Sequence, residues 1–341
     1  ACGGPPPVAP GPERAQVELT DADVRAIARV LAFEDRREFD PVAFDRLADG
    51  REEVRRRVAL AAGRIGDPDA VSLLTRLLDD DPSTAVRADA AFALGLLGDT
   101  SDLVMASLRE AVPGSWVPPR TAETDVVVEV VQALARLGTF DARALVVDAL
   151  RAAHPGSSEN GRRVAAGALL GIWRFRDGPG RVNAVVRYVD VPDPELRWRA
   201  AYALMRLAEP EAVPRLFPLL ADDDHRARAQ AARALAAPVV DSAGFRDSAV
   251  VALATALDDE HPHVRINAVR ALGTYGDDAP APRMAALLAD PVEPVAFAAA
   301  GALAPLAARP RDSLAAVLDD PARPFPVRAQ VARALADVDP D

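Results

Sequence analysis

Two histidines beside a carboxylate are the residues of this sequence that come nearest to a metal site. His261 and His263 follow Glu260 with one proline between them, and imidazole nitrogens and carboxylate oxygens both bind zinc. Other turns of the chain carry Asp-Pro where this one carries His-Pro, and Asp-Pro is typical of the first turn of a helix. The sequence therefore predicts a helix cap at His261, no metal site and no cofactor.

Other catalytic groups are scarce. The chain has four His and one Cys, and it contains no glycine-rich phosphate loop, no nucleophile elbow and no pairing of Cys with His. Acidic runs at 79–81, 222–224 and 258–260 lie in predicted turns, where helix capping and solubility explain them better than metal binding. We expect no active site within this chain.

The single cysteine, Cys2, lies at the start of a Pro- and Gly-rich segment. Residues 1–17 hold too little apolar surface to order themselves, and the prolines favour an extended, disordered tether. A Cys after Ala and before small residues resembles the junction of a bacterial lipoprotein whose signal peptide has been removed, which implies a lipid on Cys2. The tether would then hold residues 18–341 on the periplasmic side of the bacterial cell envelope. The alternative is a disordered terminus of a cytoplasmic protein with an incidental thiol.

Charge and hydropathy limit the partners. The formal net charge is -11, whereas general nucleic-acid binding requires a positive field over the protein surface. No window approaches the roughly 18 consecutive apolar residues of a membrane span. We therefore expect a protein or peptide partner rather than nucleic acid, and membrane contact only through a lipid on Cys2.

The elements that would position a binding site repeat along the chain. Segment 86–95 has relatives whose starts lie 31 to 40 residues apart. The ninth position is Leu in eight of the nine copies, and positions five, six and eight are almost always Ala or Val. Shorter amphipathic stretches such as 70–78 and 282–288 lie between the copies. This pattern predicts about nine helical hairpins in an all-α solenoid. The copies begin at Val54, Val86, Val126, Arg162, Leu196, Ala227, Val264, Val295 and Val327.

A short motif recurs within the copies. Val-Arg precedes Ala-Ala-x-Ala-Leu-Gly and a later Gly-Asp, as in residues 86–99. This motif resembles the HEAT repeat in its bacterial, PBS-lyase-like form, and the resemblance extends over residues 20 to 338. It implies that the arginine at position two bonds to Asp side chains or carbonyls of adjacent turns. Val127 and Ala296 replace this arginine in two copies, where we expect the series to be interrupted. The arginines concerned are Arg55, Arg87, Arg163, Arg197, Arg228, Arg265 and Arg328.

One face of the repeated helices is variable and forms the candidate binding surface. A two-helix solenoid bends so that its second helices line a concave surface, and positions four, seven and eleven follow the helical spacing of a single stripe. The middle of this predicted stripe is Glu129, Gln132, Arg136, Ala165, Ala168 and Ile172. Its later, Arg-rich part contains Arg199, Tyr202, Arg206, Gln230, Arg233, Asn267, Arg270 and Arg333.

The Arg-rich part of the stripe suits an extended, acidic peptide segment, because guanidinium groups hold carboxylates and backbone carbonyls. The alternative is a solvated face whose arginines pair with nearby acids. A second candidate contact is Trp116, in a Pro-rich insertion at 112–120. Its side chain is either an anchor for a partner or a cover folded back over its own loop.

These observations favour a non-catalytic scaffold that binds protein or peptide on the concave face. Segments 31–40 and 61–67 also resemble the start of bacterial HEAT-containing peptidyl-prolyl isomerases, in which a cyclophilin-like domain follows the repeats. In that alternative the chain is the substrate-holding arm of a longer enzyme, because nothing in these 341 residues matches a cyclophilin barrel. Other HEAT proteins are di-iron hydroxylases with His-Glu dipeptides, and this sequence has none.

Overall fold

A computed structural model describes residues 18–112, 115–117, 120–154, 158–175, 178–308 and 310–336. Within these ranges the regular structure consists of 20 α-helices and short 3-10 turns, without strands, so the predicted all-α class is confirmed. The predicted tether and Cys2 lie outside the described residues. None of the described helices combines the length and the apolar character needed to cross a membrane.

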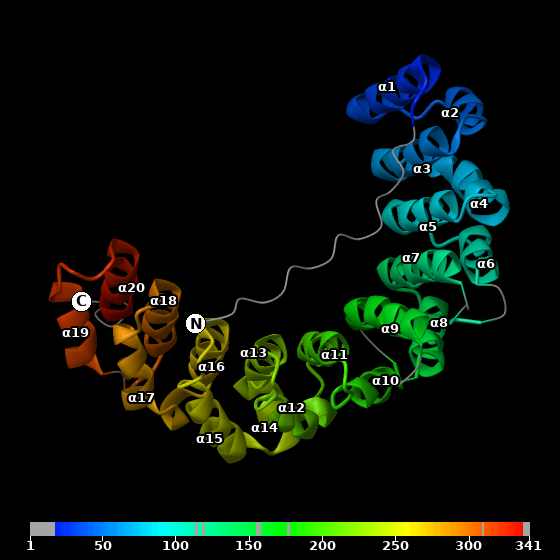
Figure 1. Cartoon of the computed structure of the whole chain (residues 1–341). Coiled ribbons are helices and arrows are strands. Elements are labelled where there is room, and N and C mark those ends of the chain that lie inside the picture. Colours follow the sequence, from blue (N-terminus) through cyan, green and yellow to red (C-terminus); the bar gives the residue numbers. More distant parts are fainter. Residues whose placement is uncertain are drawn as a thin grey trace, which may run out of the picture.

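The helices form two stacked layers that curve into an open arc (Figure 1). All nine copies of the sequence repeat lie on helices of the inner layer, which confirms the predicted solenoid of about nine hairpins. The inner layer contains α1 (Asp21–Arg36), α3 (Glu52–Ile65), α5 (Thr84–Leu97), α7 (Thr121–Leu137), α9 (Glu159–Gly171), α11 (Pro194–Leu207), α13 (His225–Ala234), α16 (Pro262–Leu272), α18 (Glu293–Leu303) and α20 (Phe325–Ala336).

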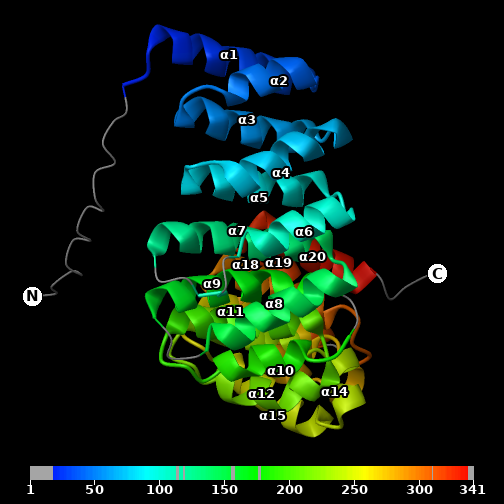
Figure 2. The same cartoon turned by 90° about the vertical axis from the view of Figure 1, so that its right-hand side faces the viewer.

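The outer layer covers the convex side of the arc, and Figure 2 shows the hairpins stacked one upon another. Between α12 and α16 the outer layer has two helices, whereas the other hairpins have one. The outer helices are α2 (Pro41–Ala48), α4 (Val71–Asp80), α6 (Asp102–Glu110), α8 (Phe140–Ala152), α10 (Arg181–Val185), α12 (Val213–Leu219), α14 (Ala237–Ala243), α15 (Arg246–Ala256), α17 (Ala281–Ala286) and α19 (Arg311–Asp319).

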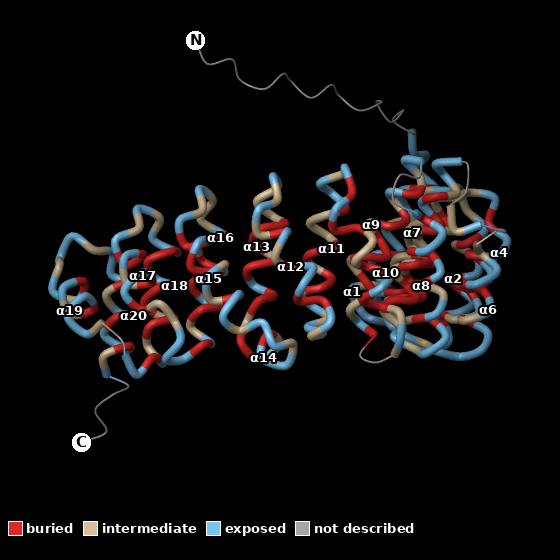
Figure 3. Tube along the Cα trace, turned by 90° about the horizontal axis from the view of Figure 1, so that it is seen from below, coloured by how far each residue is buried: buried red, intermediate tan, exposed pale blue. Residues whose placement is uncertain are grey.

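The core lies between the two layers and between successive hairpins, where the buried residues of Figure 3 are concentrated. In α5, for example, Leu94 and Ala93 are fully buried, as the repeat pattern predicts. The ninth-position leucine is also buried in α7, α11, α13, α16 and α18. Because Ala fills most of the neighbouring positions, adjacent inner helices pack closely and bury apolar surface along the whole arc.

The ends of the inner helices follow the expected capping chemistry. Asp193 accepts a hydrogen bond from the backbone N–H of Glu195 at 2.9 Å at the start of α11, where Pro194 occupies the first turn. His261 caps α16 in the same way, with Nδ1 accepting from the backbone N–H of His263 at 3.3 Å. The prediction that His261 is a helix cap is therefore confirmed. Gly98 ends α5 in the left-handed conformation, with φ 74°.

A series of Arg–Asp pairs, the arginine ladder, joins consecutive hairpins. In four repeats the arginine at position two donates two hydrogen bonds of 2.7–3.0 Å to an Asp of the next hairpin. Its remaining nitrogen donates to a carbonyl of the turn that precedes its own helix. The pairs are Arg55–Asp81, Arg197–Asp222, Arg228–Asp259 and Arg265–Asp290.

The ladder is incomplete elsewhere. Arg87 and Arg328 donate to the carbonyls of Asp81 and Leu318, and neither forms an ion pair in the described part of the chain. Arg163 instead pairs with Asp125 of the preceding inner helix. The bonds that the HEAT resemblance implied are thus complete in four repeats and partial or different in three.

Two buried tyrosines also join consecutive hairpins. The hydroxyl of Tyr188 donates to the carbonyl of Leu150 at 2.7 Å, and that of Tyr275 donates to the carbonyl of Leu235 at 2.7 Å. Burial raises the pKa of Tyr188 to about 12 and also raises that of Tyr275. Both hydroxyls therefore resist ionisation while the protein is folded.

We expect the protein to lose stability between pH 10 and pH 12. In the unfolded chain Tyr188 ionises near its ordinary pKa of about 10, so stability is complete below pH 10 and falls by about 2 kcal/mol as the pH rises to the folded value. The sequence contains no Lys, so few other groups titrate in this range. Urea unfolding followed by circular dichroism at pH 9 and pH 11.5 measures the loss. Tyr188→Phe should be less stable at pH 9 but should lose less between the two pH values, and an equal loss would contradict this account.

Candidate binding surface

The inner helices present two repeat positions to the concave side. Gln132 and Tyr202 occupy position seven of their copies and Arg136 occupies position eleven, and all three line one pocket between α7, α9 and α11. Position four is more deeply packed, since Arg199 and Asn267 are only partly exposed there, whereas position seven carries exposed arginines in its later copies. The side chains free to meet a partner are therefore mainly those of positions seven and eleven.

In the amino-terminal limb of the concave face, formed by α1, α3 and α5, several arginines are neutralised by acids of the protein itself. Arg57 and Arg64 both bind Glu34, with N–O distances of 2.9 and 3.1 Å. Arg56 binds Asp89 at 2.7 Å. In this part of the concave face the arginines are paired with nearby acids, which is the alternative interpretation of the stripe.

The rest of the concave face differs from this limb. Apart from Arg328 at the ladder position, six arginines of the inner layer from α7 to α20 form no ion pair with the residues that the structure describes, and we call these six the open arginine row. Helices α13, α16 and α20 contain no acidic residue at all, so their arginines have no carboxylate on their own helix. The open arginine row consists of Arg136, Arg174, Arg206, Arg233, Arg270 and Arg333.

Two of the predicted groove residues are held by hydrogen bonds within the protein. Arg199 donates to Glu195 four residues earlier and stacks on Trp198, with 4.5 Å from its guanidinium carbon to the ring centroid. Hydrogen bonds from Arg199, Trp198 and Arg226 lower the pKa of Glu195 to about 2. Asn267 donates to the carbonyl of Ala229 at 2.8 Å. The side-chain oxygen of Gln230 is buried without a partner in the described structure.

The predicted stripe is wrong in the fourth copy. Ala165, Ala168 and Ile172 are fully buried, so they do not face the concave side. Helix α9 ends at Gly171 and continues as one 3-10 turn, η2 (Ile172–Arg174), which rotates the following side chains relative to a continuous α-helix. As a result Trp173 and Arg174, which the repeat pattern did not identify, line the concave pocket.

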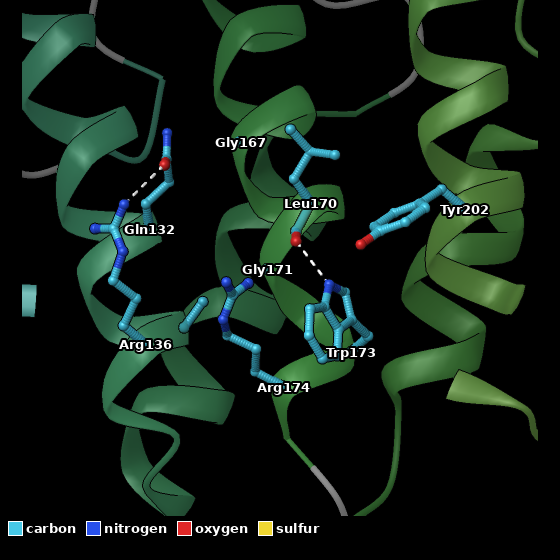
Figure 4. Close-up of a pocket in the computed structure, with 9 residues that line it drawn as sticks. Gln132, Arg136, Gly167, Leu170, Gly171, Trp173, Arg174 and Tyr202 are labelled. Carbon is cyan, nitrogen blue, oxygen red and sulfur yellow. Dashed lines mark hydrogen bonds between the residues drawn. The ribbon is translucent and has the colours of Figure 1, made fainter. Parts of the chain in front are cut away.

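This concave pocket, the central pocket, encloses about 200 Å³. In Figure 4 Gln132 and Arg136 approach it from α7, Trp173 and Arg174 from the end of α9, and Tyr202 from α11. The indole N–H of Trp173 donates to the carbonyl of Leu170 at 2.9 Å, which fixes the ring. Arg206 stacks on the same ring, with its guanidinium carbon 3.8 Å from the centroid.

The other candidates from the sequence lie elsewhere. Trp116 is half-buried and packs against the hydrophobic core, as a side chain that covers its loop does. His261 stacks on His225, with ring centroids 3.7 Å apart. No group of three or more His, Cys, Asp or Glu side chains in the described ranges is arranged to hold a metal ion.

Solved structures with a similar fold include the karyopherin Kap121p. Its complex with Ste12p aligns with a TM-score of 0.61 at 13% identity, and its complex with Pho4p aligns with a TM-score of 0.60 at 14% identity. Both alignments cover 92% of this chain and 40% of the karyopherin, so the chain spans less than half the length of that protein. Human deoxyhypusine hydroxylase in complex with glycerol aligns at 21% identity over 83% of this chain and 97% of its own, with a TM-score of only 0.31.

No curated protein matches the chain. The family model described as HEAT repeats matches residues 18–112, 152–236 and 226–304, which together make up most of the sequence. The repeat motif, the stacked hairpins and the arginine ladder agree with this match. The chain belongs to the HEAT-repeat family.

Proposed function

We propose that the concave face of this solenoid is a non-catalytic binding surface for an extended, acidic segment of a partner protein. The observation that carries the proposal is the open arginine row, which places unpaired positive charges along the inner layer of a protein whose net charge is -11. Like charges without counter-charges raise the free energy of the unbound protein, and carboxylates in matching positions lower it. Guanidinium groups also bind carboxylates with two parallel hydrogen bonds.

The stack of inner helices suggests the spacing of the acids in the partner. Packed helices lie about 8–10 Å apart, and an extended chain advances about 3.3 Å per residue. A segment that runs across the inner layer therefore passes from one repeat to the next in about three residues. We expect a preference for acidic residues at every third position.

The likeness to karyopherins supports a protein partner. In the solved complexes Kap121p is bound to Ste12p and to Pho4p, and the present chain shares the fold of that solenoid. An envelope location through a lipid on Cys2, a direct role for Trp116 and the role of the chain as the arm of a peptidyl-prolyl isomerase remain sequence-based predictions.

We expect the wild-type protein to bind a fluorescein-labelled 18-residue peptide with Glu at every third position and Ser and Gly between. Replacing Arg233, Arg270 and Arg333 together with Glu should weaken this binding at least tenfold, because three attractive charges become repulsive. Fluorescence anisotropy at 50 and 200 mM salt measures the affinity, and thermal melting checks that the fold is intact. The three side chains are exposed, so their replacement should leave stability nearly unchanged.

The matched control is the same charge change on the convex side. Arg109, Arg215 and Arg311 are exposed residues of α6, α12 and α19, and their replacement with Glu should leave peptide binding unchanged. The proposal fails if the wild-type protein binds the Glu peptide no better than its Gln counterpart, or if the two triple variants behave alike. Tighter binding of duplex DNA than of the Glu peptide would indicate nucleic acid instead.

A further inference from the structure

Arg136 lines the central pocket, but only part of its guanidinium group faces the pocket. Nη1 is buried without a hydrogen-bond acceptor in the described structure, and it lies on the side of α5, where a Cβ on Gly95 would come within 3.1 Å of it. The other terminal nitrogen, Nη2, makes only a long hydrogen bond of 3.4 Å to the side chain of Gln132. A hydrogen bond of this length is weak. Nη2 can therefore donate a stronger hydrogen bond to an acceptor bound in the pocket.

Arg136 and Arg174 bring two positive charges to the central pocket. Burial and the nearby charge of Arg174 both lower the pKa of Arg136, while Glu129 opposes them. Glu129 does not satisfy the guanidinium, because its Oε2 is itself buried without a hydrogen bond and burial raises the pKa of that carboxyl. Two guanidinium groups that repel each other at the mouth of one pocket favour a negative group between them.

The remaining walls suit the stem of a side chain. Gly167, Leu170 and Gly171 of α9 line the pocket together with Ala135 of α7, and the ring of Trp173 forms an apolar wall. Tyr202 lies across the pocket from Arg136 in Figure 4, and its hydroxyl has no partner among the described residues. A volume of about 200 Å³ accommodates one acidic side chain with part of its backbone.

We propose that the central pocket is the anchor site for one acidic side chain of the bound segment, with the carboxylate between Arg136 and Arg174 and the methylene groups against Trp173. This inference rests on the proposed function of the concave face and assigns the point at which binding is strongest. The rest of the open arginine row then holds the segment in place without a comparable pocket. The anchor lies near the middle of the arc, so the segment extends from it towards α20.

The test uses a single capped amino acid as probe, so that the pocket is measured apart from the rest of the groove. The chain has three tryptophans, and their indole N–H resonances in ¹⁵N-labelled protein report on separate places. N-acetylglutamate N-methylamide should shift the resonance of Trp173 and leave those of Trp116 and Trp198 in place, whereas the glutamine counterpart should shift none. Trp173→Phe assigns the resonance.

Arg174→Gln should weaken the binding of the glutamate probe at least tenfold, and Tyr202→Phe should weaken it less. Arg174 is exposed, so its replacement does not endanger the fold. Arg136→Gln should abolish the shift, with thermal melting as the check on folding. Equal shifts with glutamate and glutamine probes, or an unchanged affinity in Arg174→Gln, would overturn the anchor. Arg174→Gln is also tested with the 18-residue Glu peptide. If it binds this peptide like the wild type while the Arg233, Arg270 and Arg333 variant does not, the proposed function of the concave face is retained and the anchor site is rejected. If the wild-type protein does not bind that peptide, the proposed function itself fails.

Discussion

Replacing Gly95 with Val is expected to lower the free energy of unfolding by about 3 kcal/mol. A Cβ atom on Gly95 would lie 2.7 Å from the Cα of Ala133 on the next inner helix, and real Cβ atoms do not approach backbone so closely. Helices α5 and α7 would have to move apart, and the packing lost along their length adds to the cost. Gly63 meets Ala93 in the same way, with 2.7 Å to its Cα.

Chemical unfolding monitored by circular dichroism measures this loss, and Gly301→Ala is the matched control. A Cβ on Gly301 would meet only the side-chain nitrogen of Gln330, at 3.2 Å, and that flexible side chain can move. Gly301→Ala should therefore gain up to about 1 kcal/mol from helix propensity. If Gly95→Val and Gly301→Ala have equal effects, close approach of the inner helices is not what the glycine at position ten provides.

A solenoid has contacts only between neighbouring repeats, so damage at one interface is local. In Gly95→Val we expect the segments on either side of the α5–α7 interface to unfold in separate steps. Hydrogen exchange should show early opening of α3 and α5 while α11 and α13 stay protected. Uniform loss of protection would indicate that the chain folds as a single cooperative unit.

The repeat architecture was predictable because its signal is periodic. Leu94 and its equivalents recur at the same place in eight of the nine copies, and six of these eight leucines are buried, whereas Leu170 and Leu335 are only partly buried. The stripe of positions seven and eleven stays a prediction as a binding surface, and three of its residues, Gln132, Arg136 and Tyr202, line the central pocket. It was wrong at Ile172, because a 3-10 turn replaces the last helical turn and the sequence pattern does not report the change.

The state of each arginine on the stripe was harder to infer. The bond between Arg199 and Glu195 joins residues four apart on one helix, so it could have been recognised from the sequence. The bonds from Arg57 and Arg64 to Glu34 join residues more than twenty apart, and only the stacking of α1 on α3 brings them together. The same limit applies to the central pocket, whose walls come from three different repeats.

Arg265→Ala is expected to cost about 3 kcal/mol, because it removes one member of the arginine ladder and leaves its partner buried. Arg265 and Asp290 are 12% and 5% exposed, and two hydrogen bonds of 2.8 and 2.9 Å join them. Asp290→Ala in the same protein should recover part of the loss, since no uncompensated carboxylate then remains. Urea unfolding of the two single variants and the double variant measures the coupling energy. A coupling energy near zero would show that the Arg–Asp pair forms as a result of hairpin stacking and does not add to the free energy of unfolding.

The gap at Ala296 allows the opposite test. Asp320 accepts a hydrogen bond from the backbone N–H of Ala322 at 2.9 Å, as Asp290 accepts one from Val292 at 2.8 Å, so its carboxylate has the ladder geometry. A cavity of about 280 Å³ lies between Ala296 and Asp320, where a ladder arginine would be. Among the described residues the only cation that pairs with Asp320 is Arg323, a partly buried side chain 3.4 Å away.

Ala296→Arg should therefore fill the cavity, complete the ladder between α18 and α20 and raise the stability of the last hairpin by about 1 kcal/mol. The gain should disappear in the presence of Asp320→Asn, which keeps the size of the side chain but removes its charge. Local stability is best measured by hydrogen exchange in α20, because the last hairpin that the structure describes contacts one other described hairpin and reports directly on that interface. A gain that persists with Asp320→Asn would come from filling the cavity alone. A loss of protection in α20 would mean that the space between α18 and α20 is too small for the arginine that other repeats carry at this position.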